Sequence, residues 1–265
     1  MNRTAFLIHE SAAEYHAQAK QHLSSHALAD FRKCPQLFIQ KRRGIIADED
    51  RPAYLIGRAV HTLALEGEER FSADFAVGGP INEKTGQRFG STTKAFAEWA
   101  AQQGKPVLTD EQFEMVSAMA VSVRAHEQAA LLLADGIPEG VVRTEYSRLS
   151  CQIRMDWFDP HQGIVDLKTC DDLTWFEADA RRFGYGHQMA FYRAVLARVI
   201  GVAMPVFFIG VEKKAPFRCG VWKVTSDTLA VAQRENEAAI ERLKRCLEAD
   251  HWPTGYEDCR FFECV

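Results

Sequence analysis

The stretch over residues 151–170, CQIRMDWFDPHQGIVDLKTC, limits what this chain can fold into more than any other part of the sequence. Its apolar residues lie on both sides of a segment rich in turn-forming residues, DPHQG. That pattern predicts two short strands joined by a turn, Gln152–Phe158 and Ile164–Lys168. Because side chains alternate across a strand, Asp166 and Lys168 are expected on one face of the second strand and Leu167 on the other.

The charged residues of this hairpin point to chemistry. Two carboxylates, Asp156 and Asp166, and the ammonium of Lys168 are expected to converge on one region. Packing alone does not favour such a cluster, because like charges repel and burial removes their hydration. Carboxylates suit a hard divalent ion such as Mg²⁺, and a nearby ammonium stabilises negative charge. The cluster predicts a metal-assisted hydrolytic centre, although Asp166 and Lys168 alone also fit an exposed ion pair at a strand edge.

Composition bounds the rest of the interpretation. The chain has 265 residues, 47% of them hydrophobic, which is enough for one sizeable core. A formal net charge of −4 means that any nucleic-acid contact needs a local basic lining. Seven cysteines, with no apolar run of signal-peptide or membrane-span length, predict reduced thiols, a cytoplasmic location and no membrane partner.

Hydrophobic periodicity and turn signals place the remaining elements. We expect helices in seven regions, at 24–38 with a break near Pro35, 53–66, 92–103, 109–135 with a capping box at Thr109, 174–183, 186–200 and 226–249. Further strands are expected at 141–149, 206–211 and 219–224, with a loop at 72–92. The predicted class is α/β (α+β), with a mixed central sheet flanked by helices.

Five segments, in this order, resemble motifs of the PD-(D/E)XK nuclease superfamily, most closely its RecE-type, RecB-like exonucleases (exodeoxyribonuclease VIII). They are the N-terminal Ser25–Pro35 segment, GRAVH at 57–61, RMD at 154–156, DLKT at 166–169 and QMAFY at 188–192. The last four span about half the chain. The resemblance implies a restriction-endonuclease-like core and one nuclease domain over 1–265, with a helical arm (1–50), a core holding the catalytic sheet (51–225) and a C-terminal helix and tail (226–265).

The resemblance also assigns roles to individual residues. It implies two metal ions, Mg²⁺ or Mn²⁺, held by side chains and by one backbone carbonyl, that of Leu167. The implied side-chain ligands are Asp156, Asp166, His61 and, directly or through water, Glu145. Gln188 and Tyr192, four residues apart on one helix face, are implied to lie beside the metals and contact DNA or position Lys168. On their own, His61, Glu145, Gln188 and Tyr192 also fit ordinary structural positions.

Basic residues are the expected source of a DNA-binding channel. Arg154 is expected on the strand face of Asp156, where it contacts a phosphate or forms a salt bridge with a carboxylate. The other candidates are exposed cations that equally fit a solvated surface, namely Arg58, Arg181, Arg182, Lys213 and Lys214.

The implied function is a Mg²⁺-dependent exonuclease that digests linear double-stranded DNA from its ends, 5′→3′. It would leave 3′ single-stranded tails for an annealing protein of the RecT type in DNA recombination, and would act as a homo-oligomeric ring, a trimer or tetramer. One alternative is a structure-specific or iron–sulfur nuclease of other polarity, with a cluster on Cys34, Cys246, Cys259 and Cys264. Another is a catalytically silent DNA-binding module.

Overall fold

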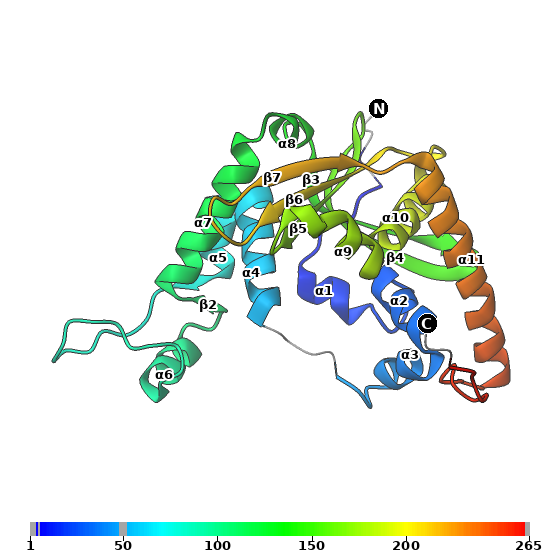
Figure 1. Ribbon diagram of the computed structural model, residues 1–265, viewed down its shortest axis with the longest axis horizontal. Coiled ribbons are helices and arrows are strands. Elements are labelled where there is room, and N and C mark those ends of the chain that lie inside the picture. Colours follow the sequence, from blue (N-terminus) through cyan, green and yellow to red (C-terminus); the bar gives the residue numbers. More distant parts are fainter. Residues whose placement is uncertain (1–3, 5, 48–51, 263–265) are drawn as a thin grey trace.

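A five-stranded mixed sheet forms the centre of the computed structural model, which describes residues 4, 6–47 and 52–262 (Figure 1). Its strands lie in the order β3 (Ile137–Tyr146), β4 (Leu149–Asp159), β5 (Gly163–Cys170), β6 (Val206–Glu212) and β7 (Cys219–Lys223). Only β5 and β6 run parallel, and the other neighbours are antiparallel. The predicted mixed sheet flanked by helices is confirmed.

Helices cover both faces of this sheet. The apolar core on one face is shared with α2 (Ser25–Lys33), α10 (Tyr185–Ile200) and α11 (Ser226–Ala249). The core on the other face is shared with α4 (Pro52–His61), the π-helix η1 (Thr62–Glu66), α7 (Asp110–Ala125) and α8 (Glu127–Leu132). Since β5 and β6 are buried between the two cores, both strands are almost continuously apolar, and a charged residue within them stands out.

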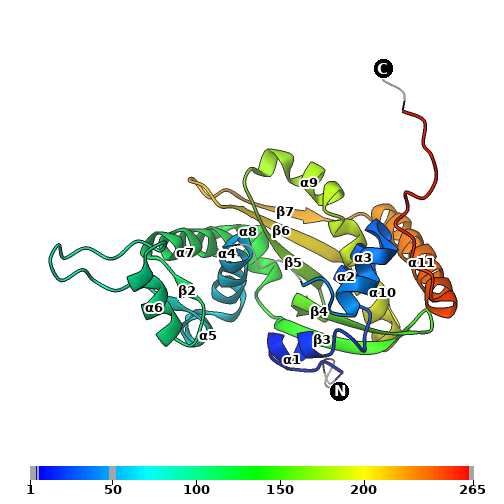
Figure 2. The same ribbon diagram turned by 90° about the horizontal axis from the view of Figure 1, so that it is seen from below.

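Of the remaining elements, α3 (Pro35–Arg42) packs beside α2 over the first face, and α1 (Ala12–Ala17) lies beside β3 (Figure 2). The short η2 (Leu173–Trp175) and α9 (Phe176–Arg182) precede α10. At one end of the sheet, α5 (Glu68–Asp74), α6 (Lys94–Gln102) and the short parallel pair β1 (Ala76–Val77) and β2 (Val107–Leu108) form a lobe from which a long loop projects (Figure 2). None of the helices over the described residues is long and apolar enough to cross a membrane.

Two predictions about single elements were wrong. The helix expected over 109–135 is divided at His126, where the backbone is extended and the imidazole caps α8. The capping box at Thr109 is confirmed, with Gln112 as its partner.

The first strand of the meander, β3, begins at Ile137 and not at 141. Pro138 fits within β3 because β3 is an edge strand, where a missing N–H is tolerated. The turn that joins β3 to β4 lies at Ser147 and Arg148, both with positive φ, as in the tight two-residue turns of hairpins. This shift of four residues changes which acid reaches the centre of the sheet.

Candidate active site

The candidate site begins where β4 and β5 separate. The two strands pair at only three positions, Trp157↔Val165, Phe158↔Ile164 and Asp159↔Gly163. At the next position of β4, the Asp156 carboxylate accepts a hydrogen bond from the backbone N–H of Leu167, at 2.9 Å. A side chain thus satisfies a donor that a strand would otherwise bond, and the strands are free to open around it.

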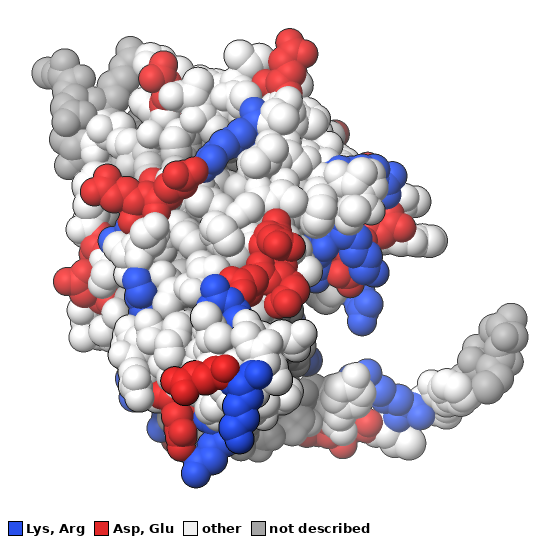
Figure 3. All heavy atoms as spheres, turned by 90° about the vertical axis from the view of Figure 1, so that its left-hand side faces the viewer, with Lys and Arg blue, Asp and Glu red and all other residues white. Residues whose placement is uncertain are grey.

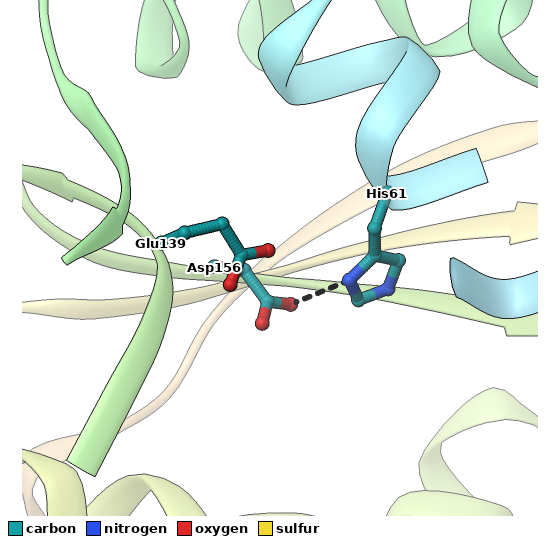
Figure 4. Close-up of side chains that lie close together, drawn as sticks. All are labelled: His61, Glu139 and Asp156. Atoms are coloured by element: carbon teal, nitrogen blue, oxygen red, sulfur yellow. Dashed lines mark ion pairs between the residues drawn. The ribbon is translucent and has the colours of Figure 1, made fainter. Parts of the chain in front are cut away.

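Three side chains converge at this opening. One ligand atom each of His61, Glu139 and Asp156 lies within 4.8 Å of the other two (Figure 4). His61 Nδ1 is 3.4 Å from Asp156 Oδ2. His61 is the last residue of α4, at the point where the α-helix gives way to the π-helical turn of η1, a local irregularity that is frequent at functional sites. Two carboxylates and an imidazole form a donor set for a divalent transition metal or Mg²⁺.

The acid that β3 brings to the site is Glu139. Glu145, the residue expected from the sequence, is exposed near the hairpin turn, opposite Ser150. Six residues of strand separate Glu145 from Glu139, or about 20 Å at ~3.3 Å per residue. Glu139 lies opposite Asp156, at the one position between Ile137 and Tyr146 where β3 and β4 are not paired, and its φ is +56°. The expectation for Glu145 is corrected because it came from starting the strand after Pro138.

Asp166 and Lys168 lie beside this group, on β5. Asp166 is only 1% exposed, and its Oδ2 is 2.5 Å from Lys168 Nζ. Its Oδ1 has no hydrogen-bond partner among the described residues. Burial raises the pKa of Asp166 to about 6, against the opposing charge of Lys168. A buried carboxylate with an unpartnered oxygen is unfavourable unless something binds it, and a metal ion fits that role.

The ammonium of Lys168 is held from two sides. Burial by itself lowers the pKa of Lys168, but the carboxylates of Asp166 and Asp156 outweigh burial, so that the pKa is raised. The ring of Tyr185, the first residue of α10, lies 4.9 Å from Nζ in a cation–π contact. Lys168 therefore stays protonated, which favours an electrostatic role over a general base.

The surroundings of Glu139 disfavour the charged form of its carboxyl group. Burial, followed by the charge of Asp156, raises its pKa to about 8. The guanidinium of Arg154 counteracts this effect, since its Nε lies 2.8 Å from Glu139 Oε2. Of the two roles considered for Arg154, the structure shows the salt bridge.

With this geometry in view, comparison with known proteins identifies the family. The model of a PDDEXK-like domain of unknown function (DUF3799) matches residues 24–264. The chain belongs to this PDDEXK-like family. A crystal structure from Eubacterium rectale, described as a "putative exonuclease", has the same fold with a TM-score of 0.71 and 18% identity, covering 97% of this chain and 96% of that one. No curated protein matches the chain.

The other motif residues of this PDDEXK-like chain lie close to the cluster. On α10, Gln188 Nε2 donates to the hydroxyl of Tyr192 at 3.3 Å. Tyr192 is buried, and this burial is the main reason why its pKa lies well above the usual value. The charges of Asp166 and Asp156 raise the pKa further. Over the described residues, neither side chain forms a hydrogen bond with Lys168, so their predicted roles in positioning it or contacting DNA stay predictions. The same holds for the carbonyl of Leu167, whose N–H is the group bonded to Asp156.

Most of the predicted basic residues have ordinary surface partners. Arg181 lies 3.9 Å from Glu177, Lys213 lies 2.9 Å from Asp171, and Arg182 packs over the ring of Phe183. Arg58 is exposed on α4, three residues before His61, and Lys214 is exposed after β6. On the face formed by the lobe, basic and acidic groups are interspersed and form no continuous basic surface (Figure 3). A DNA-binding lining must be sought elsewhere.

The cysteines do not gather in the part of the chain that is described. Cys34 is the N-cap of α3, Cys246 is half-buried on α11 and Cys259 is exposed in the tail. These three do not form a group of converging ligand atoms, and Cys264 lies outside the described residues.

Proposed function

We propose that this chain is a metal-dependent deoxyribonuclease that digests linear double-stranded DNA from its ends. The family and the fold support a nuclease. The observation that carries the proposal is the buried Asp166 carboxylate, with one oxygen unpartnered over the described residues, next to Lys168 and the group of His61, Glu139 and Asp156. This set combines metal ligands with a fixed positive charge, as phosphodiester hydrolysis requires.

Asp166, Asp156, Glu139 and His61 would hold Mg²⁺ or Mn²⁺, with two ions per site as the proposed number. A bound divalent ion neutralises phosphate charge and lowers the pKa of a bound water. The imidazole of His61 shifts the donor set toward Mn²⁺, since nitrogen ligands favour it over Mg²⁺. The ammonium of Lys168, fixed by Asp166 and Tyr185, would stabilise negative charge on the phosphate oxygens.

The finer parts of the proposal come from the motif resemblance. They are 5′→3′ polarity, 3′ single-stranded products for an annealing protein of the RecT type, and a ring of three or four subunits that encloses the DNA. The proposed cytoplasmic location rests on the cysteines and on the lack of an apolar run of signal-peptide length in the sequence. The order of GRAVH, RMD, DLKT and QMAFY along the chain supports this subgroup.

The test is digestion of a linear duplex labelled at the 5′ or 3′ end of one strand, beside a closed circle of the same sequence, in EDTA, Mg²⁺ or Mn²⁺. We expect digestion of the linear form only, with early release of the 5′ label and retention of the 3′ label on a shortening strand. Reversed release would overturn the polarity, and cutting of the circle would overturn the exonuclease assignment. Binding without turnover in either metal would favour the silent DNA-binding module, and iron with visible absorbance would favour the iron–sulfur nuclease.

A further inference from the structure

A cavity of about 470 Å³ lies away from the candidate active site, between the C-terminal half of α2, the last turns of α11 and the tail that follows. Its charged lining is entirely basic and consists of Arg32, Lys33, Arg242, Arg245 and His251. We call this cavity the basic pocket. In a chain of net charge −4, five basic side chains around one cavity without a lining carboxylate form a local exception.

The cations of the basic pocket are largely uncommitted to carboxylates. Lys33, Arg242 and Arg245 are exposed and form no salt bridge with any described residue. The contact of Arg242 is with the ring of Phe31, which lies 6.0 Å from the guanidinium carbon. Like charges held this close repel one another, and an anion in the pocket would relieve that repulsion.

Acidic groups near the pocket are already occupied. Asp250 accepts from Arg43 and from the indole of Trp252. Glu257 directs both carboxylate oxygens to Thr254 and Gly255, at the pocket rim. The charges of Glu235 and Glu241 act on Arg32 and Arg245, but these two acids are themselves paired with His187 and Lys244. The pocket therefore keeps an excess of positive charge.

The dipole of a helix explains the position of only some of the basic residues that line the pocket. Arg32 and Lys33 lie in the last turn of α2, where cations stabilise the carbonyl end of a helix. Arg242 and Arg245 precede the last turn of α11, which contains no basic residue. These two arginines, three residues apart on the same helix face, have no such role.

The basic pocket is linked to the candidate active site through two helices that pack against each other, α2 and α10. The C-terminal end of α2 carries Arg32 and Lys33 of the pocket, and α10 carries Tyr185, which contacts Lys168.

We propose that the basic pocket binds backbone phosphates of a single-stranded nucleic acid. This inference rests on the proposed nuclease function, because it supplies the strand that leaves or enters the site. A flexible single strand can bend so that its phosphates contact exposed guanidinium groups on a concave surface. A duplex is too stiff to bend into a cavity of this size.

The test compares two double variants with equal charge loss. Arg242→Ala/Arg245→Ala removes the pocket arginines, and Arg198→Ala/Arg234→Ala removes two exposed arginines that do not line it. Binding of a fluorescent single-stranded oligonucleotide is measured by anisotropy in EDTA, so the result does not depend on catalysis. We expect the pocket variant to bind about tenfold more weakly and its salt slope to fall by about 1.4, at about 0.7 for each lost phosphate contact. The charge-matched variant should bind as the wild type does.

Equal binding by the two double variants would overturn the proposal, as would weaker binding with an unchanged salt slope. A third measurement separates a strand from a free anion. Inorganic phosphate and an unlabelled single-stranded oligonucleotide are each used to displace the labelled one. If both do so at the same concentration of phosphate groups, the pocket is a site for free phosphate and the proposal fails. Arg242→Lys/Arg245→Lys, which keeps the charge, should restore most of the affinity. A wild type that binds through these arginines but never cleaves would refute the nuclease function alone.

Discussion

Asp166 and Glu139 reach the same site from strands of very different regularity. Asp166 lies in β5, which pairs with β6 at every residue from Ile164 to Cys170, and its carboxylate touches the ammonium of Lys168 on the same strand. Glu139 lies in the edge strand β3, at φ of +56°, and its counter-charge is Arg154 on the neighbouring strand. A regular strand thus fixes acid and cation together, whereas the edge strand holds its acid through a cross-strand pair.

The largest effect should come from replacing the acid on β5, Asp166. Asp166→Asn removes one charge from the metal site and leaves the shape of the side chain intact. We expect a loss of nuclease activity of about 10³-fold, since metal binding and charge stabilisation supply several kcal/mol of the barrier reduction. Circular dichroism should show a folded protein. Full activity in Mg²⁺ would remove Asp166 from the mechanism.

Replacing the acid on β3, Glu139, should have a smaller effect on activity, and one that excess metal partly reverses. Glu139→Gln should weaken metal binding by about 10- to 100-fold, since the other ligands remain, and excess metal should restore part of the activity. Glu145→Gln is the matched control and should behave as the wild type. Titration with Mn²⁺ monitored calorimetrically measures both, and a weaker Glu145→Gln variant beside an unaffected Glu139→Gln variant would contradict the assignment.

The pH dependence of stability sharpens the comparison, because both carboxyls have raised pKa values. Between its ordinary pKa of 4.5 and the folded value of about 8, Glu139 holds a proton that the unfolded chain has lost. Asp166 does the same between 3.8 and about 6. Their contribution to stability is therefore complete at low pH and is lost as the pH rises through each folded value.

At ~1.4 kcal/mol per pH unit, the two carboxyls should together lower the unfolding free energy of the metal-free protein by about 5 kcal/mol between pH 5 and 8, measured by urea denaturation in EDTA. Glu139→Gln should flatten the part of the curve above pH 6. In saturating Mn²⁺ the trend should reverse, because ligation requires deprotonated carboxylates. Metal-free stability that rises with pH would show that these pKa values are not raised.

The smallest effect concerns the ring that holds Lys168. Tyr185→Leu should lower kcat by less than about tenfold, with little change in KM, because the cation–π contact contributes about 1 kcal/mol. Tyr185→Phe keeps the ring and should restore the rate, which separates positioning of Lys168 from general damage to the fold. An equal loss in both variants would point to the hydroxyl instead.

The same contrast explains what the sequence could reveal. Alternation in DLK placed Asp166 and Lys168 on one face of a strand, and the helical pattern around His61 placed the imidazole on α4. Both residues lie in backbone that follows local preference. Glu139 was missed because Pro138 and a left-handed residue interrupt the pattern of a strand, and such backbone is set by edge position and tertiary contacts. The separation of β4 from β5 was equally invisible, since it depends on a side chain bonding across strands.

That hydrogen bond gives Asp156 a second duty, because its carboxylate is both a candidate metal ligand and the acceptor for the Leu167 amide. An inactive Asp156→Ala protein would be ambiguous, since it would also leave an N–H in the centre of the sheet without its acceptor. Asp156→Asn retains an acceptor oxygen and separates the two duties. The rate at which the Leu167 amide exchanges with deuterium then reports whether this hydrogen bond is intact, and it can be measured without any substrate.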